Sequence, residues 1–152
     1  MDKLIFETGI KEYEVNGGEI LRFNPADPNV YQRFMEARDQ IQALDREYSV
    51  KIAPLAEAPE AEGEEVLSRM HALDQQVKER LSYVFGTEND FDRILGGVNL
   101  LAPTDTGERV ITNLFNALMP IIQKGISDYA KGKADTAVAE AKQNRAQRRA
   151  KK

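Results

Sequence analysis

The segment Ser82–Ile122, SYVFGTENDFDRILGGVNLLAPTDTGERVITNLFNALMPII, holds a large share of the big apolar side chains in this chain. It is interrupted repeatedly by glycine and proline, at Gly86, Gly96, Gly97, Pro103 and Gly107. Since one long helix does not tolerate so many stops, the segment predicts a corner. One helix should end near Gly86, a short helix should cover residues 89–95, and a last helix should begin near 108.

The overall composition is typical of a single soluble domain with a lean core. Of the 152 residues, 41% are apolar and 30% are charged. The absence of cysteine excludes disulfides and cysteine nucleophiles, and one histidine cannot anchor a zinc site. No apolar run reaches the roughly 18 residues of a membrane span, and the first residues contain no signal-peptide core. We therefore expect a cytoplasmic protein.

Charge is unevenly distributed along the chain. From Lys131 onward there are eight Lys and Arg residues and two acidic ones, whereas the preceding 130 residues carry 13 basic and 23 acidic groups. Residues 132–152 also lack large apolar side chains, so we expect a basic tail that is flexible or a frayed helix. The acidic run over 57–65 is typical of a solvated linker.

The N-terminal region predicts a β-hairpin over residues 3–23. Apolar residues flank an Asn-Gly pair at 16–17, which is the strongest short hairpin signal. The apolar residues switch from even to odd positions near Gly9, so they change to the other face of a strand, which indicates a bulge or a break. Asp27 and Pro28 then suit the N-cap and the first position of a helix.

Apolar periodicity predicts helices in the rest of the chain, because apolar residues recur three, four and seven positions apart. A stretch rich in proline and glutamate offers no face to bury and separates the first two helices. The expected elements are a helix over 28–52, a linker over 53–63, a helix over 64–85 antiparallel to the first, a short helix over 89–95 and a helix over 108–131.

The expected fold is therefore mainly α with an N-terminal β-hairpin (α+β). It is a small bundle of about four helices in a single domain over residues 1–131. Leu81 and Phe115 should be buried as members of the middle and last helical stripes. Pro120 removes one backbone hydrogen bond and should kink the last helix.

Candidate catalytic and metal sites have simpler structural explanations. The polar residues at 88–92 lack the glycine and terminal glutamate of a calcium loop, and capping of a helix start by Thr87 or Asn89 explains them better. His71 lies beside the apolar seam and is expected at the surface. Gly96 and its neighbouring glycine are not followed by a phosphate-binding motif, and they are typical of a helix end and a tight turn. We expect no enzymatic activity and no cofactor or metal.

The order of several turn, cap and core patterns resembles the small tail assembly chaperones encoded beside the tape-measure gene of tailed (siphovirus-like) phages and prophages of Gram-positive bacteria. The resemblance covers about residues 4–125. The patterns that carry it are Tyr13–Val15, the Asn16-Gly17 turn, Phe23-Asn24-Pro25, Asp27-Pro28, Phe34, Val84-Phe85-Gly86, Leu95-Gly96-Gly97-Val98-Asn99, and Val110 through Ile122 with Phe115 and Pro120.

This resemblance implies stoichiometric binding and no catalysis. The partner would be the long helical tape-measure protein, which the chaperone covers until tail-tube subunits replace it. The protein would then act in the cytoplasm of the bacterial host and be absent from the mature virion. Whether it forms a homo-oligomer is left open.

Two groups of residues are candidates for contact with a partner. A short helix and a glycine turn should not bury all the apolar residues of the corner, so the expected docking residues are Ile94, Leu95, Val98, Leu100 and Leu101. The basic tail could contact phosphates through Arg145, Arg148, Arg149, Lys151 and Lys152. Two alternatives to the chaperone remain: a structural or scaffolding subunit of the virion, and a nucleic-acid-binding regulator that uses the tail. Nucleic acid is the less favoured partner because the tail lacks interleaved aromatic residues.

Overall fold

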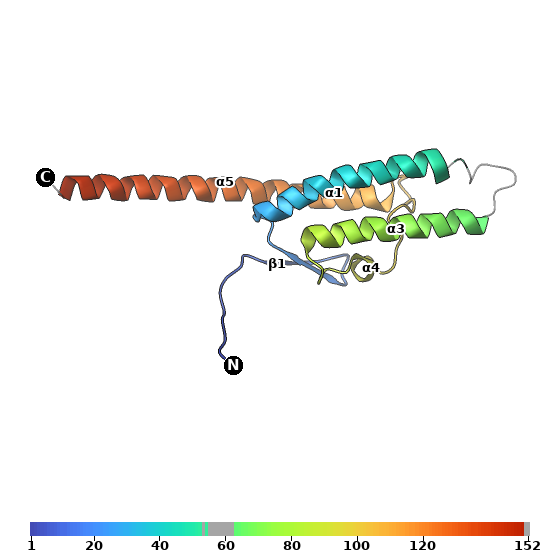
Figure 1. Cartoon of the computed structure of the whole chain (residues 1–152), viewed down its shortest axis with the longest axis horizontal. Coiled ribbons are helices and arrows are strands. Elements are labelled where there is room, and N and C mark those ends of the chain that lie inside the picture. The colour runs from blue at the N-terminus through green and yellow to red at the C-terminus, as the bar shows by residue number, and fades with distance from the viewer. Residues whose placement is uncertain (53, 55–62, 151–152) are drawn as a thin grey trace.

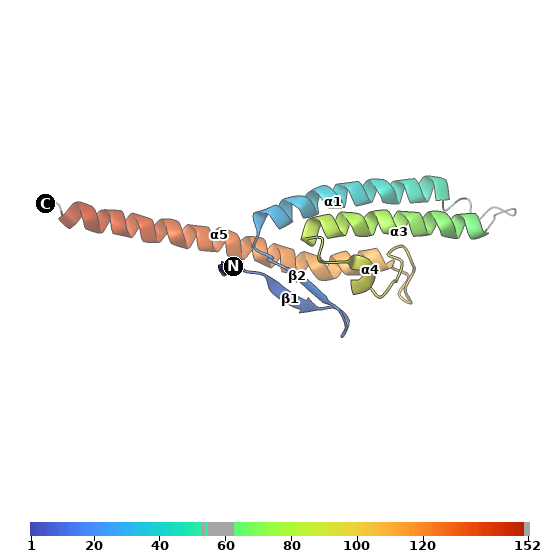
Figure 2. The ribbon, with the colours of Figure 1, turned by 60° about the horizontal axis from the view of Figure 1, so that its bottom comes forward.

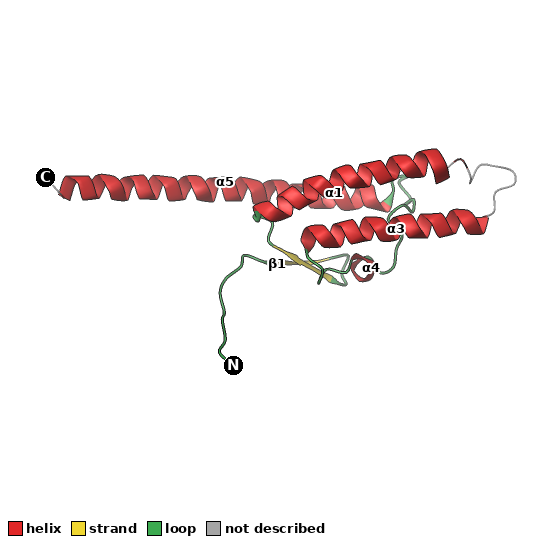
Figure 3. Ribbon diagram, in the orientation of Figure 1, coloured by secondary structure: helices red, strands yellow, loops and turns green. Residues whose placement is uncertain are grey.

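The computed structural model of the chain describes residues 1–52, 54 and 63–150. Within them, an N-terminal hairpin precedes a set of helices (Figures 1 and 3). The elements are β1 (Lys11–Glu14), β2 (Ile20–Phe23), α1 (Pro28–Glu47), the π-helix η1 (Tyr48–Ile52), α3 (Gly63–Phe85), α4 (Phe91–Ile94) and α5 (Val110–Ala150). The fold is mainly helical with an N-terminal two-stranded hairpin, and the expected fold class is confirmed.

The long helices form an elongated bundle. α1 and α3 run antiparallel side by side, and the first half of α5 lies along them, while the hairpin and α4 cover another side (Figure 2). Buried side chains from all these elements meet in one main core. Its members include Leu21, Phe23, Phe34, Ala37, Leu81, Val84, Phe91, Leu100, Leu118 and Ile122.

Local sequence signals explain the hairpin turn and the start of α1. Asn16 and Gly17 have φ angles of 52° and 74°, the left-handed conformation that an Asn-Gly turn favours. The Asp27 carboxylate accepts a hydrogen bond from the Asn29 amide at 2.9 Å, and Pro28 occupies the first turn of α1. Both predictions are confirmed.

A buried asparagine completes the short sheet. The side chain of Asn89 accepts a hydrogen bond from the Arg22 amide at 2.9 Å and donates one to the Arg22 carbonyl at 2.8 Å. It also donates to the Phe85 carbonyl at 2.8 Å, which ties β2 to the end of α3. Asn89 therefore takes the place of a third strand at the outer edge of β2.

The chain between β2 and α1 crosses α5 at a buried glycine. A Cβ atom on Gly125 would lie 1.8 Å from the carbonyl oxygen of Pro25. No side chain fits at this crossing, so glycine allows the hairpin and α5 to approach each other.

Three expected boundaries need correction. Among the residues that the structure describes, strands form only at β1 and β2; residues 1–10 lie outside them, and residues 1–8 form an exposed arm. The last five residues of the expected helix over 28–52 are π-helical. α5 does not end at Lys131 but runs to Ala150, because the alanine, lysine, glutamate, glutamine and arginine residues beyond it are strong helix formers that continue an already nucleated helix. It passes through Pro120 without interruption. The predicted linker over 53–63 lies outside the described residues except at residue 54 and at Gly63, which belongs to α3.

Candidate functional site

The structure buries most of the expected docking residues of the corner. Ile94, Leu100 and Leu101 are at most 5% exposed, and Leu95 is half-buried against the core. Val98 alone of the five remains substantially exposed, at 45%. The expectation that the corner leaves these residues exposed is therefore wrong for the three that are buried.

The corner is closed by the loop of residues 95–109, which joins α4 to α5 and which we call the corner loop. Its first glycines, Gly96 and Gly97, have φ angles of 64° and 77° and end α4 in a tight turn, as predicted. Asp90 caps α4 by accepting hydrogen bonds from two amides of the first turn, so the capping role falls on Asp90 and not on Thr87 or Asn89.

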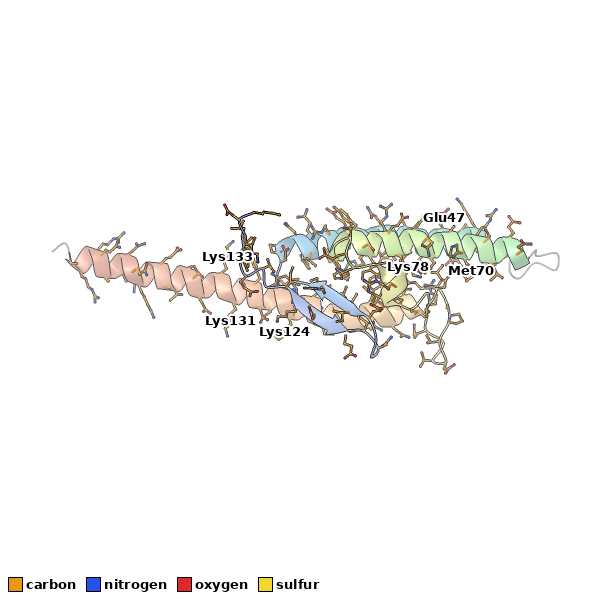
Figure 4. The ribbon with its side chains drawn as sticks, turned by 90° about the horizontal axis from the view of Figure 1, so that it is seen from below. Glu47, Met70, Lys78, Lys124, Lys131 and Lys133 are labelled. Carbon is orange, nitrogen blue, oxygen red and sulfur yellow. The ribbon has the colours of Figure 1, made fainter. Side chains whose placement is uncertain are left out.

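A charge network beside the corner loop, with Lys78 and Asp74 buried and Asp92 half-exposed, explains why the loop lies close to α3. Lys78 of α3, labelled in Figure 4, contacts Asp74 at 2.8 Å and Asp92 of α4 at 2.7 Å. The Asp74 carboxylate also accepts a hydrogen bond from the Leu100 amide at 2.7 Å. The hydrogen bond from the Leu100 amide thus ties the corner loop to the charge network of α3.

The network shifts the pKa values of two of its members. Burial by itself lowers the pKa of Lys78, but the hydrogen bonds and charges of Asp74 and Asp92 outweigh burial, and the pKa is raised overall. The hydrogen bond from Lys78 lowers the pKa of Asp92. The sequence contained a signal for the network, because Asp74 and Lys78 are four residues apart and directly follow Leu73 and Val77 of the apolar stripe.

A crevice with a mostly apolar lining lies in another place, between α1, α3 and α5. It has a volume of about 380 Å³. We call it the helical crevice, and its apolar lining consists of Phe34, Ile41, Leu44, Leu73, Val77, Leu101, Ile111, Phe115 and Met119. Phe115 was expected to be buried, but it is only half-buried, because it lines this crevice. Its ring packs nearly perpendicular to that of Phe34, with the ring centroids 5.8 Å apart. Leu81 is fully buried, as predicted.

Polar groups surround the opening of the helical crevice. Arg109 of the corner loop donates a hydrogen bond to the Asp45 carboxylate of α1, and this contact raises the pKa of Arg109. Arg38 also lines the crevice, and among the described residues its buried Nε has no hydrogen-bond partner. An occupant that offered an oxygen atom at this position would satisfy the Nε donor.

The basic residues of the tail lie on the second half of α5, which extends beyond the rest of the protein (Figure 1). Arg145, Arg148 and Arg149 are exposed, whereas Lys151 and Lys152 lie outside the described residues. Lys131 and Lys133 lie where α5 leaves the body (Figure 4). The basic groups therefore lie well away from the helical crevice.

The described residues show few other arrangements that could bind a ligand or a metal ion. His71 is exposed on α3. Over residues 1–52, 54 and 63–150, histidine, aspartate and glutamate side chains nowhere gather in groups of three or more that could hold a metal ion. Among the helices that the structure describes, none combines the length and apolar character needed to cross a membrane.

The fold and the site together define a small, mainly helical α+β protein with an apolar crevice between three helices. No model of a protein family, no curated protein and no solved structure matches the chain.

Proposed function

We propose that this protein is a phage tail assembly chaperone that binds the tape-measure protein stoichiometrically during tail assembly. The observation that carries the proposal is the helical crevice, an apolar hollow between three helices in which Leu44, Phe115 and Met119 are partly exposed. A groove of this kind suits the apolar face of an amphipathic helix, which is the form a tape-measure protein presents before the tube surrounds it. The order of sequence patterns shared with tail assembly chaperones supports the same proposal.

The details of the helical crevice suit a helical partner. Its walls are apolar along α1 and α5, so an exposed apolar stripe gains burial by docking there. The buried Nε of Arg38 would donate to a backbone or side-chain oxygen of the docked segment. The ion pair of Arg109 and Asp45 at the rim would fix the orientation of the docked segment more than add affinity.

Co-expression with the protein encoded by the neighbouring tape-measure gene tests the proposal. The soluble fraction of the tape-measure protein should rise when the chain is present, and the two should purify together. A variant carrying Leu44→Asp and Met119→Asp should lose this effect, because docking would bury unpaired charges in the helical crevice. The control carries Asn113→Asp and Ala117→Asp, which add the same two charges at exposed positions of α5.

Circular dichroism of each variant must show a folded body before its result is interpreted. A tape-measure protein that is equally insoluble with and without the chain would contradict the proposal. Finished particles supply a second test, since the chaperone should act in the host cytoplasm and be absent from purified tails. Detection of the chain in purified tails at stoichiometric levels would favour the structural or scaffolding subunit.

The second candidate function is nucleic-acid binding, and the exposed basic end of α5 favours it. Arg145, Arg148 and Arg149 lie on the exposed half of α5 that extends beyond the body, where phosphates could approach them. Binding of this kind should weaken steeply as salt rises and should disappear when the residues after 131 are removed. If the same truncated chain still raised the soluble fraction of the tape-measure protein, the tail would not be needed for the chaperone function.

A further inference from the structure

The N-terminal arm, residues 1–8, carries three consecutive large apolar side chains that contact almost nothing. Leu4 and Ile5 are each 87% exposed and Phe6 is 71% exposed. Figure 1 shows the arm leaving the body beyond β1. Single exposed apolar residues are normal on protein surfaces, but three in a row on an extended segment indicate a surface that becomes covered.

The base of the arm is held in a defined direction. Gly9 has a φ of 74°, and a Cβ there would lie 2.7 Å from Nδ2 of Asn24. The same Nδ2 donates a hydrogen bond to the Thr8 carbonyl at 3.1 Å, and the Gly9 amide donates to the Glu7 carboxylate at 2.8 Å. The glycine and its hydrogen bonds therefore turn the arm away from the body.

The sequence of the arm is complementary to itself. We propose that residues 3–7 of two copies of this chain pair as antiparallel strands about a two-fold axis at Ile5. Lys3 of each copy then lies opposite Glu7 of the other, Leu4 lies opposite Phe6, and Ile5 lies opposite its own equivalent. Opposite charges and apolar pairs facing each other across strands stabilise such a ribbon, and a two-fold axis makes both halves of the contact identical.

The other registers are much poorer. A parallel arrangement in register places Lys3 opposite Lys3 and Glu7 opposite Glu7, and directly opposed like charges are unfavourable. An antiparallel shift by one residue toward the N-terminus places Asp2 opposite Glu7. A shift by two places Asp2 opposite Phe6 and Lys3 opposite Ile5. The register centred on Ile5 is the one that pairs charge with opposite charge and apolar with apolar.

The two faces of the ribbon have different character, because side chains alternate along a strand. Leu4 and Phe6 of both copies occupy one face, which is wholly apolar. The two Ile5 side chains occupy the other face between two Lys3–Glu7 ion pairs. A ribbon of two strands is marginal in water by itself, so the pairing should depend on protein concentration.

Sedimentation velocity of the full chain, with no tag on the arm, tests the pairing. The apparent mass of the wild-type protein should rise toward that of a dimer as the protein concentration increases. Lys3→Glu and Glu7→Lys should each weaken association by about tenfold, because each variant opposes like charges twice in its own dimer. An equimolar mixture of the two variants should recover the wild-type affinity, since both pairs are attractive in the mixed dimer. The body should melt at the wild-type temperature in all samples.

Cysteine crosslinking supplies the register, because the chain has no cysteine of its own. Ile5→Cys should form a disulfide-linked dimer on oxidation. Lys3→Cys should not, because two residues at that position would be about 13 Å apart along the ribbon. Lys3→Cys mixed with Glu7→Cys should crosslink. A wild-type chain that stays monomeric at high concentration would overturn the proposal. A dimer unaffected by the charge variants, or one crosslinked through Lys3→Cys alone, would overturn it too.

Discussion

Replacing Asp74 by alanine tests whether the buried network holds the corner loop. The Asp74 carboxylate is 3% exposed, and it accepts hydrogen bonds from the Lys78 ammonium and from the Leu100 amide. Without it the buried Leu100 amide has no acceptor, which costs about 1–3 kcal/mol. The charge-assisted bond to Lys78 is lost as well, although Asp92 still pairs with the ammonium. Together these losses should lower the free energy of unfolding by about 3–5 kcal/mol.

Urea denaturation followed by circular dichroism measures this change. Asp74→Asn should cost less than Asp74→Ala, because the amide oxygen can still accept from Leu100 while the charge is lost. Glu79→Ala, at an exposed position of the same helix, is the control and should change stability by no more than about 0.5 kcal/mol. Hydrogen exchange at the Leu100 amide should accelerate in Asp74→Ala. A loss below about 1 kcal/mol, comparable to a typical net hydrogen bond, would refute the view that the network holds the loop.

The pKa of Lys78 is raised, so the stability it contributes is present below the ordinary lysine pKa of about 10.4 and is lost as pH rises through the folded value. The pKa of Asp92 is lowered, so its contribution is present above about pH 3.9 and is lost as pH falls through the folded value. The melting temperature should therefore fall at both high and low pH. Lys78→Met should flatten the slope of melting temperature against pH at both ends, and equal slopes in the wild type and the variant would contradict this. In urea denaturation, Gly125→Ala should lower the free energy of unfolding by at least about 1–3 kcal/mol, because the added methyl group meets backbone atoms. Gly132→Ala, at an open helical position, should instead raise it by about 0.5–1 kcal/mol. Removing the residues after 131 should reduce the helical circular dichroism signal yet leave the melting temperature nearly unchanged, because those that the structure describes are exposed; a clear drop would mean that they pack on the body.

The sequence by itself determined the features that depend on neighbouring residues. The turn at Asn16-Gly17, the cap formed by Asp27 with Pro28, and the end of α3 at Gly86 follow from backbone preferences that act over a few positions. The helical stripes also predicted that Leu81 is buried, because a strong 3.6-residue period requires an apolar face against the core.

Only the tertiary structure decided which apolar residues stay open to a partner. The corner sequence indicated surplus apolar surface, but the hydrogen bond from the Leu100 amide to Asp74 ties the corner loop to α3, and Leu100 and Leu101 are packed among apolar residues of the core. The partly exposed apolar residues lie instead at the helical crevice, which three helices separated in sequence form beside Phe115. Likewise, the need for glycine at position 125 follows from the crossing of a distant chain segment and from nothing nearby in the sequence. Exposure depends on what packs across from a residue, and contacts between residues far apart in sequence are settled only when the chain is folded.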